Sequence, residues 1–150
     1  MTQVDLHTIA NIQTGQPHAA AQTGLKEWHR IVAALDWDRL PDLLADDVVF
    51  RNPASFEPLH GKDTMVAILR AVFTIFQEFK YLRHFGSSTG YVLEFSARVG
   101  DESVFGVDLV EFDQEGRITD FMVMMRPASV VLTLAAEAGK HLANNQAATA

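Results

Sequence analysis

The chain has 150 residues, of which 48% are hydrophobic and 21% are charged, and this fits one ordinary globular domain. Twelve Lys and Arg against nineteen Asp and Glu give a formal charge of −7, and the basic residues are scattered, so we expect no nucleic-acid partner and no membrane binding. Cysteine is absent, which excludes disulfides, thiolate nucleophiles and cysteine-ligated zinc. No apolar run has the length of a signal peptide or a membrane span, so we expect a soluble, cytoplasmic protein.

The first 20 residues are polar and show no sustained periodicity, so we expect a loose N-terminal arm over residues 1–20. A single domain is expected over residues 21–142, and a polar tail over residues 143–150.

Helical periodicity begins after the arm. Apolar residues recur at steps of three and four, the spacing of an amphipathic helix, at Leu25, Trp28, Ile31, Val32 and Leu35. A short helix near residues 40–44 follows, and then a strand over residues 48–52 that Pro53 ends, since proline donates no ladder hydrogen bond.

The rest of the chain predicts one long helix and a meander of strands. A helical apolar face runs from Met65 to Phe76. Extended runs follow at about 79–86, 90–99, 103–113 and 117–126, separated by turn signals. After Pro127 a last helix is expected. This order predicts an α+β fold in which helices pack on one face of a curved, mostly antiparallel sheet.

Several local strings carry a resemblance to a known family. They are Leu43-Leu44-Ala45-Asp46-Asp47, Asn52-Pro53, Pro58-Leu59-His60-Gly61-Lys62-Asp63, and Val107 to Asp113 running into Glu115-Gly116-Arg117-Ile118. In this order and spacing, over about residues 25–126, the chain resembles the nuclear transport factor 2-like superfamily, and within it the SnoaL-like and steroid delta-isomerase-like proteins. The resemblance implies a cone in which helices close over a bent sheet around an apolar pocket. It names no single chemistry.

The resemblance assigns expected roles to three positions. Asn52 falls where the steroid isomerases have a catalytic aspartate base, and Trp28 falls where they have an oxyanion-binding tyrosine. Asp108 falls on their second oxyanion donor, an aspartic acid kept protonated by apolar surroundings. The family's base is an aspartate, and an amide cannot shuttle a proton between carbons, so the chain departs from the isomerase pattern.

Asp108 stands in a strand that is apolar on both faces. Alternation places it with Val104, Gly106 and Val110, opposite Phe105 and its neighbours. Whichever face points inward, burial should raise the pKa of the carboxyl. Asp108 is therefore either a pocket-facing acid or a structural carboxylate bonded to backbone.

Asn52 and Trp28 each have a structural alternative. Asn52 either caps the bend before Pro53 or positions a ligand oxygen. Trp28 lies on the helical apolar stripe, where a tryptophan is more often part of the core, although its indole N–H needs a partner when buried.

An aromatic-rich wall is expected around these three residues. Family placement and alternation predict that the lining consists of Phe50, Tyr91, Leu93, Phe95, Ala97, Phe121, Val123 and Met125. Such a wall suits a flat, hydrophobic ligand, and in a closed cone the same residues would fill a core.

The histidines show no HxxxH or HxH spacing, so no metal site is expected, and the absence of a phosphate-binding glycine loop argues against a nucleotide cofactor. We expect no cofactor. His84 would be the best base available if its strand pointed it inward, and a pairing with Asp108 remains open.

Three functional hypotheses follow. The first is a cofactor-free enzyme of the isomerase, cyclase or dehydratase range, acting on a small hydrophobic cyclic or aromatic substrate through Asp108. The second is a non-catalytic binder of hydrophobic small molecules, and the third is a dimeric structural or interaction module. All three predict a homodimer through the outer sheet face, because the family usually dimerises there and the strand carrying Asp108 is apolar on both sides.

Overall fold

The computed structural model describes residues 15–149, with side chains to residue 145. The elements, in chain order, are α2 (Ala19–Ala34), η1 (Trp37–Arg39), α3 (Leu40–Leu43), β1 (Leu44–Arg51), β2 (Leu59–His60), α4 (Lys62–Ile75), β3 (Gln77–Gly86), β4 (Gly90–Val99), β5 (Glu102–Phe112), β6 (Ile118–Arg126) and α5 (Ala128–Thr149). Most of the expected N-terminal arm, residues 1–14, lies outside the described residues. Residues 143–149, expected as a tail, continue α5.

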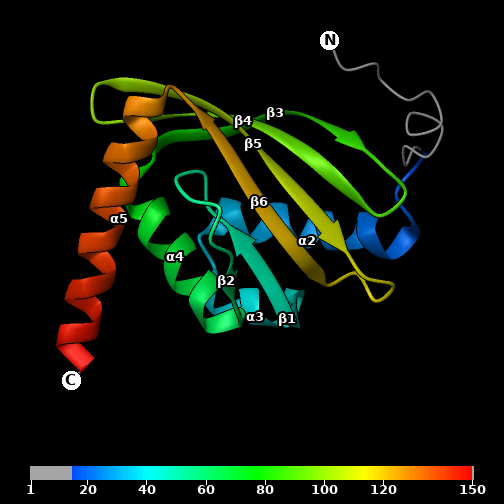
Figure 1. Cartoon of the computed structure of the whole chain (residues 1–150). Coiled ribbons are helices and arrows are strands. Elements are labelled where there is room, and N and C mark those ends of the chain that lie inside the picture. The colour runs from blue at the N-terminus through cyan, green and yellow to red at the C-terminus, as the bar shows by residue number, and fades with distance from the viewer. Residues whose placement is uncertain (1–14, 150) are drawn as a thin grey trace, which may run out of the picture.

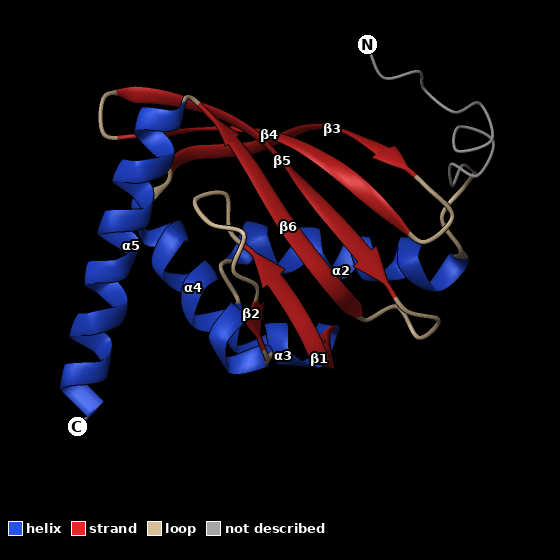
Figure 2. Cartoon of the chain, viewed as in Figure 1, coloured by secondary structure: helices blue, strands red, loops and turns tan. Residues whose placement is uncertain are grey.

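The strands form one curved six-stranded sheet in the order β2-β1-β6-β5-β4-β3. β1 runs parallel to β6, and the other neighbours are antiparallel. Helices α2 and α4 cover one face of the sheet, and α5 stands at one end of it (Figures 1 and 2). The α+β prediction is confirmed. No helix in residues 15–149 is long and apolar enough to cross a membrane.

The alternation of β5 decides which side of the sheet faces the helices. Val104, Gly106, Asp108 and Val110 are all buried, whereas Phe105 is 41% exposed. The set that contains Asp108 therefore points to the concave, helix-covered face. The sequence had left this choice open, because both sets are apolar.

Helix α2 supplies the apolar layer beneath the sheet. The Nδ1 atom of His18 accepts a hydrogen bond from the Ala21 N–H and caps the helix, which ends at Leu35 in a left-handed conformation. Trp28 is fully buried, and its ring lies 5.0 Å from the ring of Phe121 on β6. Close docking requires glycine at position 24, where a Cβ would lie 2.5 Å from the carbonyl oxygen of Gly116.

Two helical glycines should respond oppositely to alanine. We expect Gly24→Ala to lower the free energy of unfolding by about 1–3 kcal/mol, because the methyl group would overlap backbone. Gly139→Ala in α5 should raise it by about 0.5–1 kcal/mol, because nothing lies within 4 Å of the added Cβ and alanine favours the helix. Urea titration of both variants measures the difference, and a destabilised Gly139→Ala would contradict it.

Candidate functional site

A cavity of about 230 Å³ lies between the concave sheet face and the helices. The cavity is lined by side chains from three helices, α2, α4 and α5, from the loop after β1, and from all six strands. Apart from the indole of Trp28, the polar side chains in its lining are those of Asn52 and Asp108. The cavity is thus a largely apolar chamber with a carboxyl and an amide in its wall.

Asp108 is the carboxyl of this chamber. It is 5% exposed, and its Oδ2 accepts a hydrogen bond from the Tyr81 hydroxyl at 2.7 Å. Burial raises the pKa of Asp108 to about 7, because a carboxylate loses its hydration there, while the hydrogen bond from Tyr81 acts in the opposite direction. At neutral pH the group is therefore divided between acid and carboxylate.

Trp28, Tyr81 and Asp108 form a chain of two hydrogen bonds. The Trp28 Nε1–H donates to the Tyr81 hydroxyl oxygen at 2.9 Å, and that hydroxyl donates to Asp108. Burial and the neighbouring Asp108 hold the pKa of Tyr81 well above its ordinary value, so the phenol stays protonated and donates. Trp28 thus lies on the buried apolar face of its helix, as the sequence indicated, and its indole N–H donates a hydrogen bond to Tyr81.

Tyr81 is a residue that sequence reasoning missed. Its signal was the strand alternation of β3, which puts Tyr81 on the same face as Phe79, and Phe79 lines the cavity. The partner of Asp108 could not be read from the sequence, because β3 has irregular pairing with β4 on both sides of Tyr81.

Asn52 has features of both of its expected roles. Its Oδ1 accepts a hydrogen bond from the Ala54 N–H at 2.9 Å, which closes the bend after β1, and the residue also lines the cavity. Its amide N–H groups have no hydrogen-bond partner among residues 15–149 and remain able to donate to a ligand.

The expected wall is found in part. Phe50, Phe95, Phe121, Val123 and Met125 line the cavity. Tyr91, Leu93 and Ala97 do not, which corrects the expected lining. Tyr91 and Leu93 are buried in the core together with Ala21 and Leu25, because α2 fills that end of the concave face. The wall also includes Phe73 of α4, Phe76 between α4 and β3, Phe79 of β3 and a set of α5 residues, none of which the sequence analysis expected in the wall.

The described histidines lie outside the cavity lining. His84 is exposed, with its ring 5.3 Å from that of Tyr91, and the hydrogen bond to Asp108 comes from Tyr81. His29 is half-buried beside the Tyr81 ring, and burial lowers its pKa. Within residues 15–149, no group of three or more His, Cys, Asp or Glu side chains could hold a metal ion.

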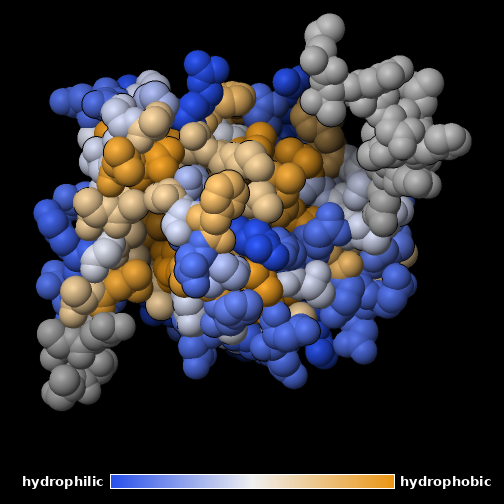
Figure 3. Space-filling view, in the orientation of Figure 1, coloured by the Kyte–Doolittle hydropathy of each residue, from blue (hydrophilic) through white to orange (hydrophobic). Residues whose placement is uncertain are grey.

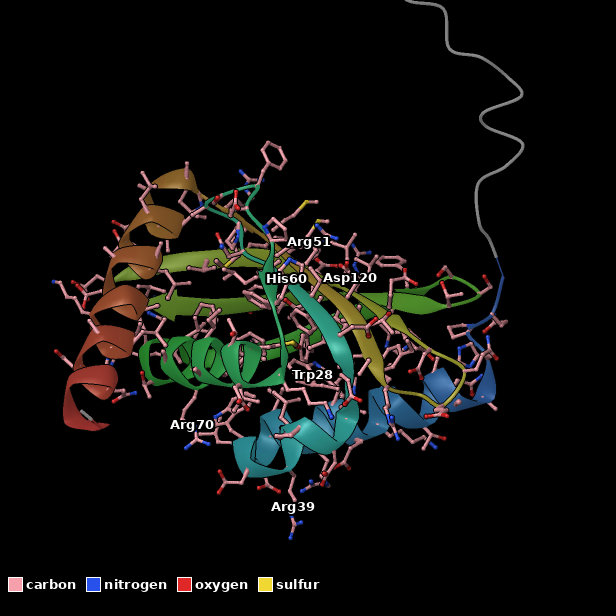
Figure 4. The ribbon with its side chains drawn as sticks, turned by 60° about the horizontal axis from the view of Figure 1, so that its bottom comes forward. Trp28, Arg39, Arg51, His60, Arg70 and Asp120 are labelled. Carbon is pink, nitrogen blue, oxygen red and sulfur yellow. The ribbon has the colours of Figure 1, made fainter. Side chains whose placement is uncertain are left out.

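The arginine side chains of the described residues lie outside the cavity lining. Figure 4 shows Trp28 directed into the molecule, while Arg39 and Arg70 point outward. Arg51 of β1 and Asp120 of β6 form an ion pair at 2.9 Å outside the cavity lining. Among residues 15–149, no cationic side chain lines the cavity, so nothing in the described part of its wall would compensate the charge of an anionic ligand.

Comparison with known proteins places this geometry in a family. The family model described as a SnoaL-like domain matches residues 25–121. The chain belongs to the SnoaL-like domain family. None of the curated proteins searched matches it.

Solved structures show the same fold. A steroid delta-isomerase from Pseudomonas aeruginosa is 43% identical, with a TM-score of 0.84 over 87% of this chain and 97% of that one. An uncharacterized protein with a cystatin-like fold from Silicibacter pomeroyi is 34% identical, with a TM-score of 0.74 over 78% and 83%. A protein named as a SnoaL-like polyketide cyclase from Shewanella denitrificans is 18% identical over 73% and 92%, and its TM-score of 0.58 shows the fold alone. The expected nuclear transport factor 2-like resemblance is confirmed.

The raised pKa of Asp108 makes stability depend on pH. The folded protein holds this proton more tightly than the unfolded chain, in which the pKa is near 3.8, so the unfolding free energy contributed by Asp108 falls as pH rises from about 4 to about 7. The two pKa values differ by the equivalent of roughly 4 kcal/mol. Denaturant titrations should therefore show that the unfolding free energy of wild type falls across this pH range, whereas that of Asp108→Asn lacks this fall. Parallel curves would refute the shift.

Proposed function

We propose that the protein is a cofactor-free enzyme of the isomerase, cyclase or dehydratase range, acting on a small hydrophobic cyclic or aromatic substrate. The observation that carries the proposal is Asp108, a buried carboxyl with a pKa of about 7 in the wall of an apolar cavity. A proton donor whose pKa lies near the working pH is the most effective general acid. Perturbed groups of this kind mark functional sites.

Asp108 is able to act in both directions of proton transfer. As the acid it protonates, or donates a hydrogen bond to, a substrate oxygen; as the carboxylate it accepts a proton from a neighbouring carbon. In a dehydration, the first step breaks the C–O bond and releases water, and the second forms the double bond and restores the acid. In a double-bond shift, the same carboxyl takes a proton from one carbon and returns it to another.

The neighbours of Asp108 assist without reacting. The Tyr81 hydroxyl donates to the carboxylate and orients it, and Trp28 holds that hydroxyl through its indole N–H, so both are positioning residues. The Asn52 amide lines the same cavity and donates to the substrate oxygen. The apolar wall provides binding energy and favours a neutral substrate with few polar groups.

The relatives support this class of reaction. A steroid delta-isomerase is 43% identical to this chain, and a protein named as a polyketide cyclase shares the fold. Asn52, in place of the aspartate base expected from the resemblance, assigns the proton transfers to Asp108 alone.

A second candidate is a non-catalytic binder that uses the same cavity. The amide at position 52 favours it, because an amide can hold an oxygen but takes no proton. The third hypothesis, an interaction module with a vestigial pocket, predicts no cavity, and the cavity counts against it.

A ligand panel tests the proposal. Steroids, polyketide-like aromatics, terpenoids and fatty acids are screened by thermal shift; a ligand at a hundredfold above its Kd should add about 2.7 kcal/mol, or several degrees. Fatty acids should shift least, since no cation lines the cavity. With a converted ligand, Asp108→Asn should reduce turnover by about 10²–10⁴-fold.

The matched control is Asp120→Asn, which makes the same chemical change in an aspartate outside the cavity and should keep turnover near wild type. Binding without turnover in wild type would favour the binder. If no ligand of the panel shifts the melting temperature of wild type or of Asp108→Asn, the result would contradict both the enzyme and the binder.

We also propose that the protein forms a homodimer through the convex face of the sheet. Phe105 and Met124 on this face are 41% and 51% exposed, and Val107 lies opposite Met124 in the β5–β6 register. When two protomers cover exposed apolar surface of this kind, it forms the usual core of a homodimer interface.

Charge placed on this face should separate the protomers. We expect Met124→Glu to change a dimer into a monomer in sedimentation velocity at micromolar concentration, because two buried glutamates would face an apolar surface. Leu132→Glu, which changes an exposed residue of α5, should leave the mass unchanged. A monomeric wild type would refute the proposal.

A further inference from the structure

Three residues of the cavity lining are exposed to solvent. They are Ala54, in the loop after β1, and Ala135 and Gly139 of α5; the other lining residues are buried or half-buried. Because a lining residue that also faces solvent borders an opening, these three mark the mouth of the cavity. All three have small side chains or none. In Figure 3, apolar surface extends between α5 and the region of this loop.

Helix α5 forms one wall of the cavity as well as part of this mouth. Val131, Leu134 and Ala138 are buried and line the cavity on the same helix as the exposed Ala135 and Gly139. Leu134 belongs to the same cluster of buried apolar residues as Val104, which lies four residues before Asp108 on β5.

The fold itself does not require glycine at position 139. A Cβ there would have nothing within 4 Å, and the backbone is ordinary helix. Glycine in a helix interior is unfavourable compared with alanine. Gly24 differs, since a Cβ there would overlap backbone. Glycine at position 139 leaves open space at the mouth of the cavity.

We propose that ligands enter between α5 and the loop after β1, and that Gly139 determines the size of the ligand that passes. The loop leaves this passage open, because its one large apolar residue, Phe56, is fully exposed and is not part of the lining. Molecules with a ring system pass, and a bulky side chain at position 139, larger than the methyl group of alanine, narrows the passage. The inference uses the cavity of the proposed function but depends on no bound substrate.

A thiol placed in the cavity wall measures access without a ligand. The chain has no cysteine, so Val123→Cys creates a single thiol, in the lining and opposite Asp108 in the β5–β6 register. Its rate of reaction with N-ethylmaleimide is measured in four backgrounds: wild type, Gly139→Ala, Gly139→Phe and Ala136→Phe. Position 136 is exposed on α5 and does not line the cavity, so it controls for an added ring on the helix.

We expect Gly139→Phe to slow the reaction by about tenfold or more, because the reagent must then wait for local opening of the structure. The Gly139→Ala and Ala136→Phe backgrounds should react within about twofold of wild type, since neither obstructs the mouth. Ala135→Phe, one turn before Gly139 on the same face of α5, should slow the reaction like Gly139→Phe and serves if that variant folds poorly.

Equal rates in all backgrounds would overturn the proposal, as would a thiol that reacts only after denaturation. Slowing by Ala136→Phe equal to that by Gly139→Phe would also overturn it. These rates need no substrate, so they distinguish a wrong passage from a wrong function: if the ligand panel fails and Gly139→Phe still slows the reaction, the passage stands and the proposed enzyme does not.

Discussion

The burial of one carboxyl is the constraint on which the site depends. Asp108 sits on an inward-facing position of β5, and the cost of desolvating its charge is met by a raised pKa and by one strong donor, Tyr81. Tyr81 in turn depends on Trp28 for the hydrogen bond to its own oxygen. A helix, an edge strand and a central strand are therefore tied together at the point where the chemistry is proposed.

The curvature of the sheet and the placement of the helices turn this carboxyl into a site. Helix α2 fills one end of the concave face, where Tyr91 and Leu93 become core. Toward the other end, α4 and α5 leave the cavity, whose wall is mainly aliphatic on the sides of these two helices and carries aromatic rings from the strands. The same fold thus supplies a rigid core and an apolar chamber within 150 residues.

Membership of the SnoaL-like domain family accounts for this architecture without fixing the reaction. The relative with 43% identity is a steroid delta-isomerase, yet Asn52 takes the position at which the resemblance leads one to expect a base. In the proposed function, Asp108 alone donates and accepts the proton, and its pKa of about 7 suits both steps. The Asn52 amide, fixed by its bond to the Ala54 N–H, suits recognition of an oxygen.

The sequence by itself determined the long helices and the five long strands in their order, the α+β class and the burial of Asp108, because hydrophobic periodicity and strand alternation are local properties of the chain. It also placed Asn52 and five of the expected aromatic and aliphatic side chains in the cavity wall. It did not indicate the two-residue strand β2. Only the tertiary structure decided that Tyr81 donates a hydrogen bond to Asp108 and that Tyr91 and Leu93 belong to the core. Both outcomes depend on strand register and helix docking, which bring together residues far apart in the sequence, such as Tyr81 and Asp108, 27 positions apart, and Trp28 and Tyr81, 53 positions apart.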